Sequence, residues 1–137
     1  MENKFSSIRV LIVQDDKVLI IHRLNHGSEY WVFPGGHVED DETAEEAAKR
    51  EVLEETSLRV TNISQIVPYL HPDNNESQAV VLAQVEPGEP RLGNGNEMFT
   101  DEDQYIPQWL DLKTALGLAN IVPEPASKIF HDLYEDK

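Results

Sequence analysis

The stretch from Gly36 to Leu58 reads GHVEDDETAEEAAKREVLEETSL. Within it we predict a helix over residues 44–56. Thr43 is a good N-cap residue, and the side chains of Glu45 and Glu46 favour the positive N-terminal end of a helix. Most of the candidate functional residues of the chain fall on this one element.

Three glutamates of the predicted helix, Glu51, Glu54 and Glu55, project from one side because they stand at positions i, i+3 and i+4. Small apolar residues continue the same stripe one or two turns earlier, at Ala44, Ala47 and Ala48. Such residues usually mark the side of a helix that faces the protein, so we expect the glutamates on a partly inward face. Close carboxylates repel one another, and burial raises the cost of keeping each one charged. Oxygen-rich clusters of this kind suit Mg²⁺ or Mn²⁺.

A solvent-exposed acidic face paired with lysine or arginine is the alternative interpretation of these glutamates. Lys49 and Arg50 are expected mainly on the other side of the helix, which argues against such pairing. The helical geometry alone leaves both interpretations open.

Apolar runs and turn residues predict strands and short helices on both sides of this helix. Before it we predict a hairpin over residues 8–13 and 18–21, a polar loop over 23–30, and a strand over 31–33 that is halted by Pro34-Gly35-Gly36. After it we predict strands over 58–70, 78–85 and 106–110, a loop over 88–104, and helices over 112–118 and 125–134. The mixed order of strands and helices predicts one α/β domain over residues 1–137.

The composition excludes several kinds of site and partner. The chain has 137 residues, 39% of them hydrophobic, which suits one folded domain. It has no cysteine, so disulfides, thiolate catalysis and cysteine-based zinc sites are excluded. No apolar run reaches the roughly 18 residues of a membrane span, and no signal peptide is apparent, so we expect a cytoplasmic protein.

The formal net charge of −15 disfavours binding to nucleic-acid duplexes and to anionic membranes. Such a chain can act on an anionic phosphate substrate if divalent cations lie between its carboxylates and the phosphates. Acidity that only keeps the protein soluble is the alternative.

The segment resembles the Nudix box, Gly-x5-Glu-x7-Arg-Glu-U-x-Glu-Glu-x-Gly-U, where U is a bulky aliphatic residue. The matching residues are Gly36, Glu42, Arg50, Glu51, Val52, Glu54, Glu55 and Leu58. Ser57 stands where the family has glycine, so we expect it to adopt the left-handed helix cap at a cost of roughly 1 kcal/mol. The resemblance implies the family fold, an α/β/α sandwich around a mixed β-sheet.

The resemblance also implies roles for individual residues. Arg50 resembles the arginine that orients a catalytic glutamate, and Glu42 resembles the first glutamate of the box, which holds the loop against the helix. The implied metal ligands are the carboxylates of Glu51, Glu54 and Glu55 and the backbone carbonyl of Gly36. One of these carboxylates, or one on a distant loop, would deprotonate the attacking water.

Three candidates lie outside the core of the motif. Glu102, or its neighbour Asp103, precedes the strand containing Trp109 and is the candidate for a further metal ligand or base. Arg23 and His37 are the candidates for contact with substrate. Solvent-exposed charges are the alternative for each of them.

The resemblance implies a Mg²⁺-dependent pyrophosphohydrolase, with Mn²⁺ as a substitute ion. Its substrate would be a nucleoside triphosphate or a nucleotide sugar such as ADP-ribose. A non-catalytic, nucleotide-sensing domain is the alternative, and the intact Arg50-Glu51-x-x-Glu54-Glu55 sequence argues against it. Homodimers occur widely in the family, so a homodimer is compatible with this assignment.

Overall fold

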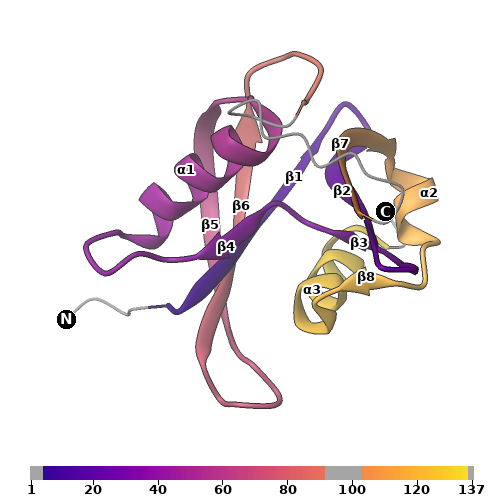
Figure 1. The fold of residues 1–137 in the computed structure, drawn as a ribbon. Helices are drawn as coiled ribbons and strands as arrows, with labels where there is room; N and C mark the ends of the chain where they lie inside the picture. Colours follow the sequence, from indigo (N-terminus) through magenta and orange to yellow (C-terminus); the bar gives the residue numbers. More distant parts are fainter. Residues whose placement is uncertain (1–4, 92–102, 136–137) are drawn as a thin grey trace.

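The computed structural model describes residues 5–91 and 103–135, shown in Figure 1. The strands are β1 (Ser7–Gln14), β2 (Lys17–Asn25), β3 (Ser28–Val32), β4 (Gly35–His37), β5 (Val60–Leu70), β6 (Ser77–Val85), β7 (Asp103–Asp111) and β8 (Ile121–Val122). The helices are α1 (Ala44–Thr56), α2 (Leu112–Leu116) and α3 (Glu124–Tyr134). None of the described helices combines the length and apolar character that a membrane crossing requires.

Strand β1 is central to the mixed sheet, whose main order is β5-β6-β1-β2-β3-β8. It runs parallel to β6 and antiparallel to β2, while β4 pairs with its first half and β7 pairs with β2. Alternate β1 side chains enter two cores, with Ile8, Val10 and Ile12 on the side of α1 and Leu11 on the side of α3. Helix α1 covers one side of the sheet and α3 the other (Figure 1), which confirms the predicted α/β/α sandwich.

The predicted loop over residues 23–30 is wrong in this structure. Strand β2 continues to Asn25 and β3 begins at Ser28, so the turn between them comprises only His26 and Gly27, with φ values of 49° and 87°. Polar residues in a strand gave no apolar signal, although a glycine-containing two-residue turn is typical of a hairpin. The short strands β4 and β8 were missed for the same reason, because neither contains an apolar run long enough to detect.

Helix α1 spans residues 44–56, as predicted, and it begins with a complete capping box. The backbone N–H of Glu46 donates to Thr43 Oγ1 over 3.1 Å, and the backbone N–H of Thr43 donates to Glu46 Oε1 over 2.9 Å. Ala47, Ala48 and Val52 are fully buried against the sheet. The capped first turn and the buried stripe fix the direction of the helix, and hence the positions of its glutamates.

Ser57 ends the helix in the left-handed conformation that we expected, with φ 65° and ψ 9°. Its backbone N–H donates to the Leu53 carbonyl, and its hydroxyl donates to the Arg91 carbonyl over 2.9 Å. We expect Ser57→Gly to increase the free energy of unfolding by up to about 1 kcal/mol, because glycine relieves the left-handed strain while the hydroxyl bond is lost. Urea unfolding of this variant beside Ser57→Ala measures the balance. Equal destabilisation by both substitutions would show that the hydroxyl bond outweighs the strain.

Candidate active site

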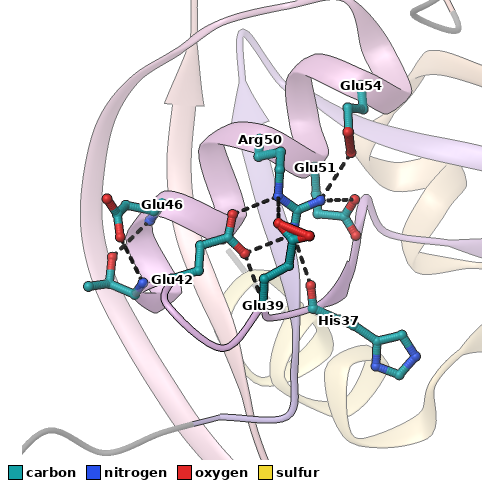
Figure 2. Close-up of polar contacts among 8 residues, drawn as sticks. His37, Glu39, Glu42, Glu46, Arg50, Glu51 and Glu54 are labelled. Atoms are coloured by element: carbon teal, nitrogen blue, oxygen red, sulfur yellow. Dashed lines mark hydrogen bonds and ion pairs between the residues drawn. The ribbon is translucent and has the colours of Figure 1, made fainter.

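The Arg50 guanidinium is the centre of a hydrogen-bond network between helix α1 and the loop that precedes it (Figure 2). Its Nε and Nη2 donate to the two carboxylate oxygens of Glu42 over 2.6 and 2.8 Å. Nη2 also donates to the backbone carbonyl of His37 over 3.0 Å. Nη1 donates to Glu51 Oε1 over 3.2 Å and to Glu54 Oε1 over 3.1 Å. Arg50 therefore connects the acidic loop before the helix to two of the predicted metal-binding glutamates.

The expectation that Arg50 lies away from the glutamates is wrong. Its long side chain reaches along the helix surface, where residues i and i+4 are neighbours, and the guanidinium supplies five N–H donors. The hydrogen bond from Arg50 lowers the pKa of the Glu42 carboxyl. The bond to Glu42 in turn raises the pKa of the Arg50 guanidinium, so this pair stays ionised.

The ionised forms of two carboxyls on the helix are destabilised by burial. Glu51 is only 9% exposed, and burial raises the pKa of its carboxyl to about 7, with the nearby charge of Glu55 adding to the effect. Burial likewise raises the pKa of Glu55 to about 7. The Glu54 side chain is more open, with 43% of its surface exposed. A cation between these groups would remove much of the cost of their ionisation.

Glu55 is held from outside the helix. The backbone N–H of Gly35 donates to Glu55 Oε1 over 3.0 Å, and the Tyr105 hydroxyl on β7 forms a hydrogen bond with the same carboxylate. Burial and the Glu55 charge raise the pKa of Tyr105, so its hydroxyl remains a proton donor. No local pattern pointed to Tyr105, because its partner lies 50 residues away on another element.

The residues present fit a divalent metal ion by their chemistry. The donor set consists of carboxylate and carbonyl oxygens, which Mg²⁺ and Mn²⁺ prefer. A Cβ at Gly36 would overlap Glu51 Oε2, so glycine lets the backbone approach this carboxylate closely. Among the described residues, no three acidic or histidine side chains converge tightly enough to hold a metal as they stand. Arg50 Nη1 engages one oxygen of Glu51 and one of Glu54, so metal binding requires these carboxylates to rotate or to use their other oxygens.

The remaining candidates have different positions. The guanidinium carbon of Arg23 lies 5.1 Å from the centre of the Tyr105 ring, and Arg23 lines a cavity beside Glu55. The imidazole of His37 is exposed and points away from the Arg50 network, to which His37 contributes only its carbonyl (Figure 2). Glu102 lies outside the described residues.

The cavity beside Glu55 has a volume of about 460 Å³. Glu55 and Gly35 line it, and so do Arg23 and Tyr105, which are paired across β2 and β7. A cavity of this size accommodates a small organic ligand. Arg9, on the β1 side of the cavity, is a residue that the sequence pattern did not single out.

Comparison with known proteins matches this chain to one protein family. A family model described as NUDIX domain matches residues 4–133. The oxidized purine nucleoside triphosphate hydrolase of Danio rerio is 32% identical over 108 residues, which span 75% of this chain and 64% of that protein. The phosphatase NudJ of Escherichia coli is 26% identical over 121 residues, which span 84% of this chain and 73% of that protein.

The fold matches solved structures over nearly its whole length. The MutT NUDIX hydrolase from Burkholderia pseudomallei superposes with a TM-score of 0.64 at 23% identity, covering 96% of this chain and 98% of the other. The chain spans only part of some curated relatives, with 64% of the Danio rerio protein and 57% of a Bacillus subtilis relative aligned.

Proposed function

Because this chain belongs to the NUDIX domain family, we propose that it is a Mg²⁺-dependent pyrophosphohydrolase acting on a nucleoside-diphosphate-linked substrate. Mn²⁺ would substitute for Mg²⁺. The observation that carries the proposal is the arrangement on α1, where Arg50 binds Glu51 and Glu54 while Glu55 borders a 460 Å³ cavity. Residues 1–137 would act as one catalytic domain.

We assign the metal-holding role to Glu51, Glu54 and Glu55, together with the carbonyl of Gly36. Bound Mg²⁺ would polarise the diphosphate, offset the negative charge that develops on it and lower the pKa of the attacking water. Arg50 would keep the Glu51 and Glu54 carboxylates oriented through its Nη1.

The base would be one of the glutamates whose pKa lies near neutrality. Glu55 and Glu51 both have a pKa of about 7, which suits a group that takes up a proton at physiological pH. Gly35 and Tyr105 fix the Glu55 carboxylate from two sides, so it is the better oriented of the two toward the cavity. We therefore favour Glu55, of the three glutamates, as the one that also takes up the proton, whereas Glu51 would serve as a ligand only.

A nucleoside triphosphate is the substrate that we propose to test first, because the Danio rerio relative is described as a hydrolase of such compounds. Product release would be measured from nucleoside triphosphates, oxidised deoxynucleoside triphosphates, nucleotide sugars and ADP-ribose, each with Mg²⁺, Mn²⁺ or EDTA. We expect turnover of at least one class with a metal ion, and none in EDTA. Absence of turnover across the panel, with a nucleotide still raising the melting temperature, would favour a sensing domain.

We expect the gain in melting temperature from Mg²⁺ to be larger at pH 8 than at pH 6. The pKa values of Glu51 and Glu55 are about 7 in the folded protein and near 4.5 in an unfolded chain. The folded, metal-free protein therefore binds more protons than the unfolded chain between these values, and its stability from these groups falls as the pH rises toward 7.

Mg²⁺ must displace these protons at pH 6 but not at pH 8. Its apparent Kd should be about tenfold weaker at pH 6 for each proton displaced. Thermal melts across a Mg²⁺ titration at both pH values measure the difference, and Glu45→Gln, an exposed change on the same helix, is the control. Equal affinity at the two pH values would argue that the ion binds away from Glu51 and Glu55.

A further inference from the structure

The cavity beside Glu55 lies between two parts of the sheet. Arg9 on β1, Gln78 on β6 and Tyr69 on β5 line one side. Arg23 on β2 and Tyr105 on β7 line the other. In a chain with a net charge of −15, two arginines facing one cavity create a local positive region.

The guanidinium of Arg9 has donors that no residue in the described part of the chain accepts from. It is partly buried, and its Nη1 donates to the carbonyl of Phe33 over 3.0 Å. Within the described ranges Arg9 forms no ion pair with a carboxylate, and Glu55 influences it only at longer range. A guanidinium carries five N–H donors and no acceptor, so the remaining donors of Arg9, which lines the cavity, have no fixed partner from residues 5–91 or 103–135.

The wall next to Arg9 is a row of polar groups in register across three strands. Ser7 pairs with Gln78, and Gln78 pairs with Tyr69. Gln78 Nε2 donates to Ser7 Oγ over 3.4 Å. The half-buried hydroxyl of Tyr69 has no hydrogen bond to another described residue. Arg9 and Tyr69 thus both line the cavity with donors that a ligand with several acceptors would satisfy.

We propose that Arg9 determines which substrate this cavity accepts, by selecting a moiety with two neighbouring acceptor atoms. This inference rests on the proposed function, since Glu55, one of the proposed metal ligands, lines the cavity. A guanidinium can donate two parallel hydrogen bonds to two adjacent acceptors. The keto face of a nucleobase, such as O6 and N7 of guanine, presents them, and so does a second phosphate or carboxylate.

Binding without metal tests the proposal separately from catalysis. Calorimetry in EDTA would compare GMP with AMP, because guanine presents the neighbouring acceptors O6 and N7, whereas adenine carries an amino donor in place of O6. Inorganic phosphate is the probe for the anionic source. The variants are Arg9→Met, which keeps the aliphatic stem, Arg9→Lys, which keeps the charge, and Tyr69→Phe. Arg59→Met, at an exposed position outside the cavity, is the matched control.

We expect Arg9→Met to weaken binding by about tenfold or more, Tyr69→Phe to weaken it less, and Arg59→Met to leave it within about twofold. A preference for GMP over AMP that disappears in Arg9→Met, without competition by phosphate, would show that Arg9 binds the acceptors of a base. Equal binding of all nucleotides, with phosphate competing only when Arg9 is present, would show that Arg9 binds an anionic group instead. If Arg9→Met does not fold, loss of the GMP-over-AMP preference or of phosphate competition in Arg9→Lys carries the same test.

Two results would overturn the proposal. One is equal affinity of the wild type and the Arg9 variants for every probe, and the other is no binding by the wild type. Turnover that persists with Arg9-independent binding would refute this inference alone. Arg9-dependent binding with no turnover of any substrate would refute the proposed hydrolase and leave the binding site in place.

Discussion

Glu54→Gln should lower kcat for metal-dependent hydrolysis by about 10²–10⁴-fold, because a bound divalent ion supplies several kcal/mol of transition-state stabilisation. Glutamine keeps the size of the side chain and one acceptor oxygen but removes the charge that would hold the ion. The Glu54 side chain is 43% exposed, so the substitution should change the free energy of unfolding by less than about 1 kcal/mol.

The control for this prediction is Glu45→Gln on the same helix. Glu45 is exposed in the first turn, away from Arg50, and the substitution removes an identical charge from the same element. Activity should then stay within about twofold of the wild type, apart from a small helix-dipole effect on stability. Steady-state kinetics over a range of Mg²⁺ concentrations separates a lost ligand from a lost base. A normal kcat in Glu54→Gln would remove Glu54 from the proposed site.

Gly35→Ala should destabilise the fold by about 3–5 kcal/mol or prevent folding. Gly35 has a φ of 151°, which side chains rarely tolerate. A Cβ there would overlap the carbonyl oxygen of Ile8 and lie 2.8 Å from the Cα of Arg9. Both obstacles are backbone atoms of the central strand, which is buried and cannot move aside cheaply.

Gly27→Ala provides the matched comparison. Gly27 also has a positive φ, of 87°, but a Cβ there would meet nothing within 4 Å. The substitution should therefore cost only the added backbone strain, about 1 kcal/mol. Urea unfolding of both variants measures the difference, and similar losses would contradict the close packing of Gly35 against β1. A folded Gly35→Ala variant should also bind the metal ion more weakly, since the Gly35 N–H donates a hydrogen bond to the Glu55 carboxylate.

The acidic helix was predictable because its signals are local. The cap at Thr43, the alanine stripe and the spacing of the glutamates all lie within about four turns of one helix, and the structure confirms the helix. The family resemblance implied a contact of Arg50 with a glutamate, whereas helical geometry alone placed Arg50 on the other side of the helix. The geometric expectation failed because it took the direction of the Cα–Cβ bond for the position of a long, flexible side chain.

The cavity could not be predicted, since its residues come from different strands. Arg9, Tyr69 and Tyr105 are far apart in the chain and meet only through strand pairing, which one sequence does not specify. The polar character of the β2–β3 hairpin concealed that its residues form an ordered wall rather than a loop. The candidate metal ligands on α1 thus lie in one continuous segment, whereas the cavity depends on the completed sheet.

The parallel pairing of β1 with β6 has a consequence for how the protein reaches its native state. Ser7 and Gln78 are 71 positions apart, so the central strand finds this neighbour only after most of the chain has been made. Closing so long a loop is entropically costly, and domains rich in such pairings fold slowly. The strands β5 and β6, which are consecutive in the chain, can pair early. Arg9, Gln78 and Tyr69 come together only when β1 docks on that pair, so ligand-binding competence should appear as a late kinetic event, after most of the helix signal has formed.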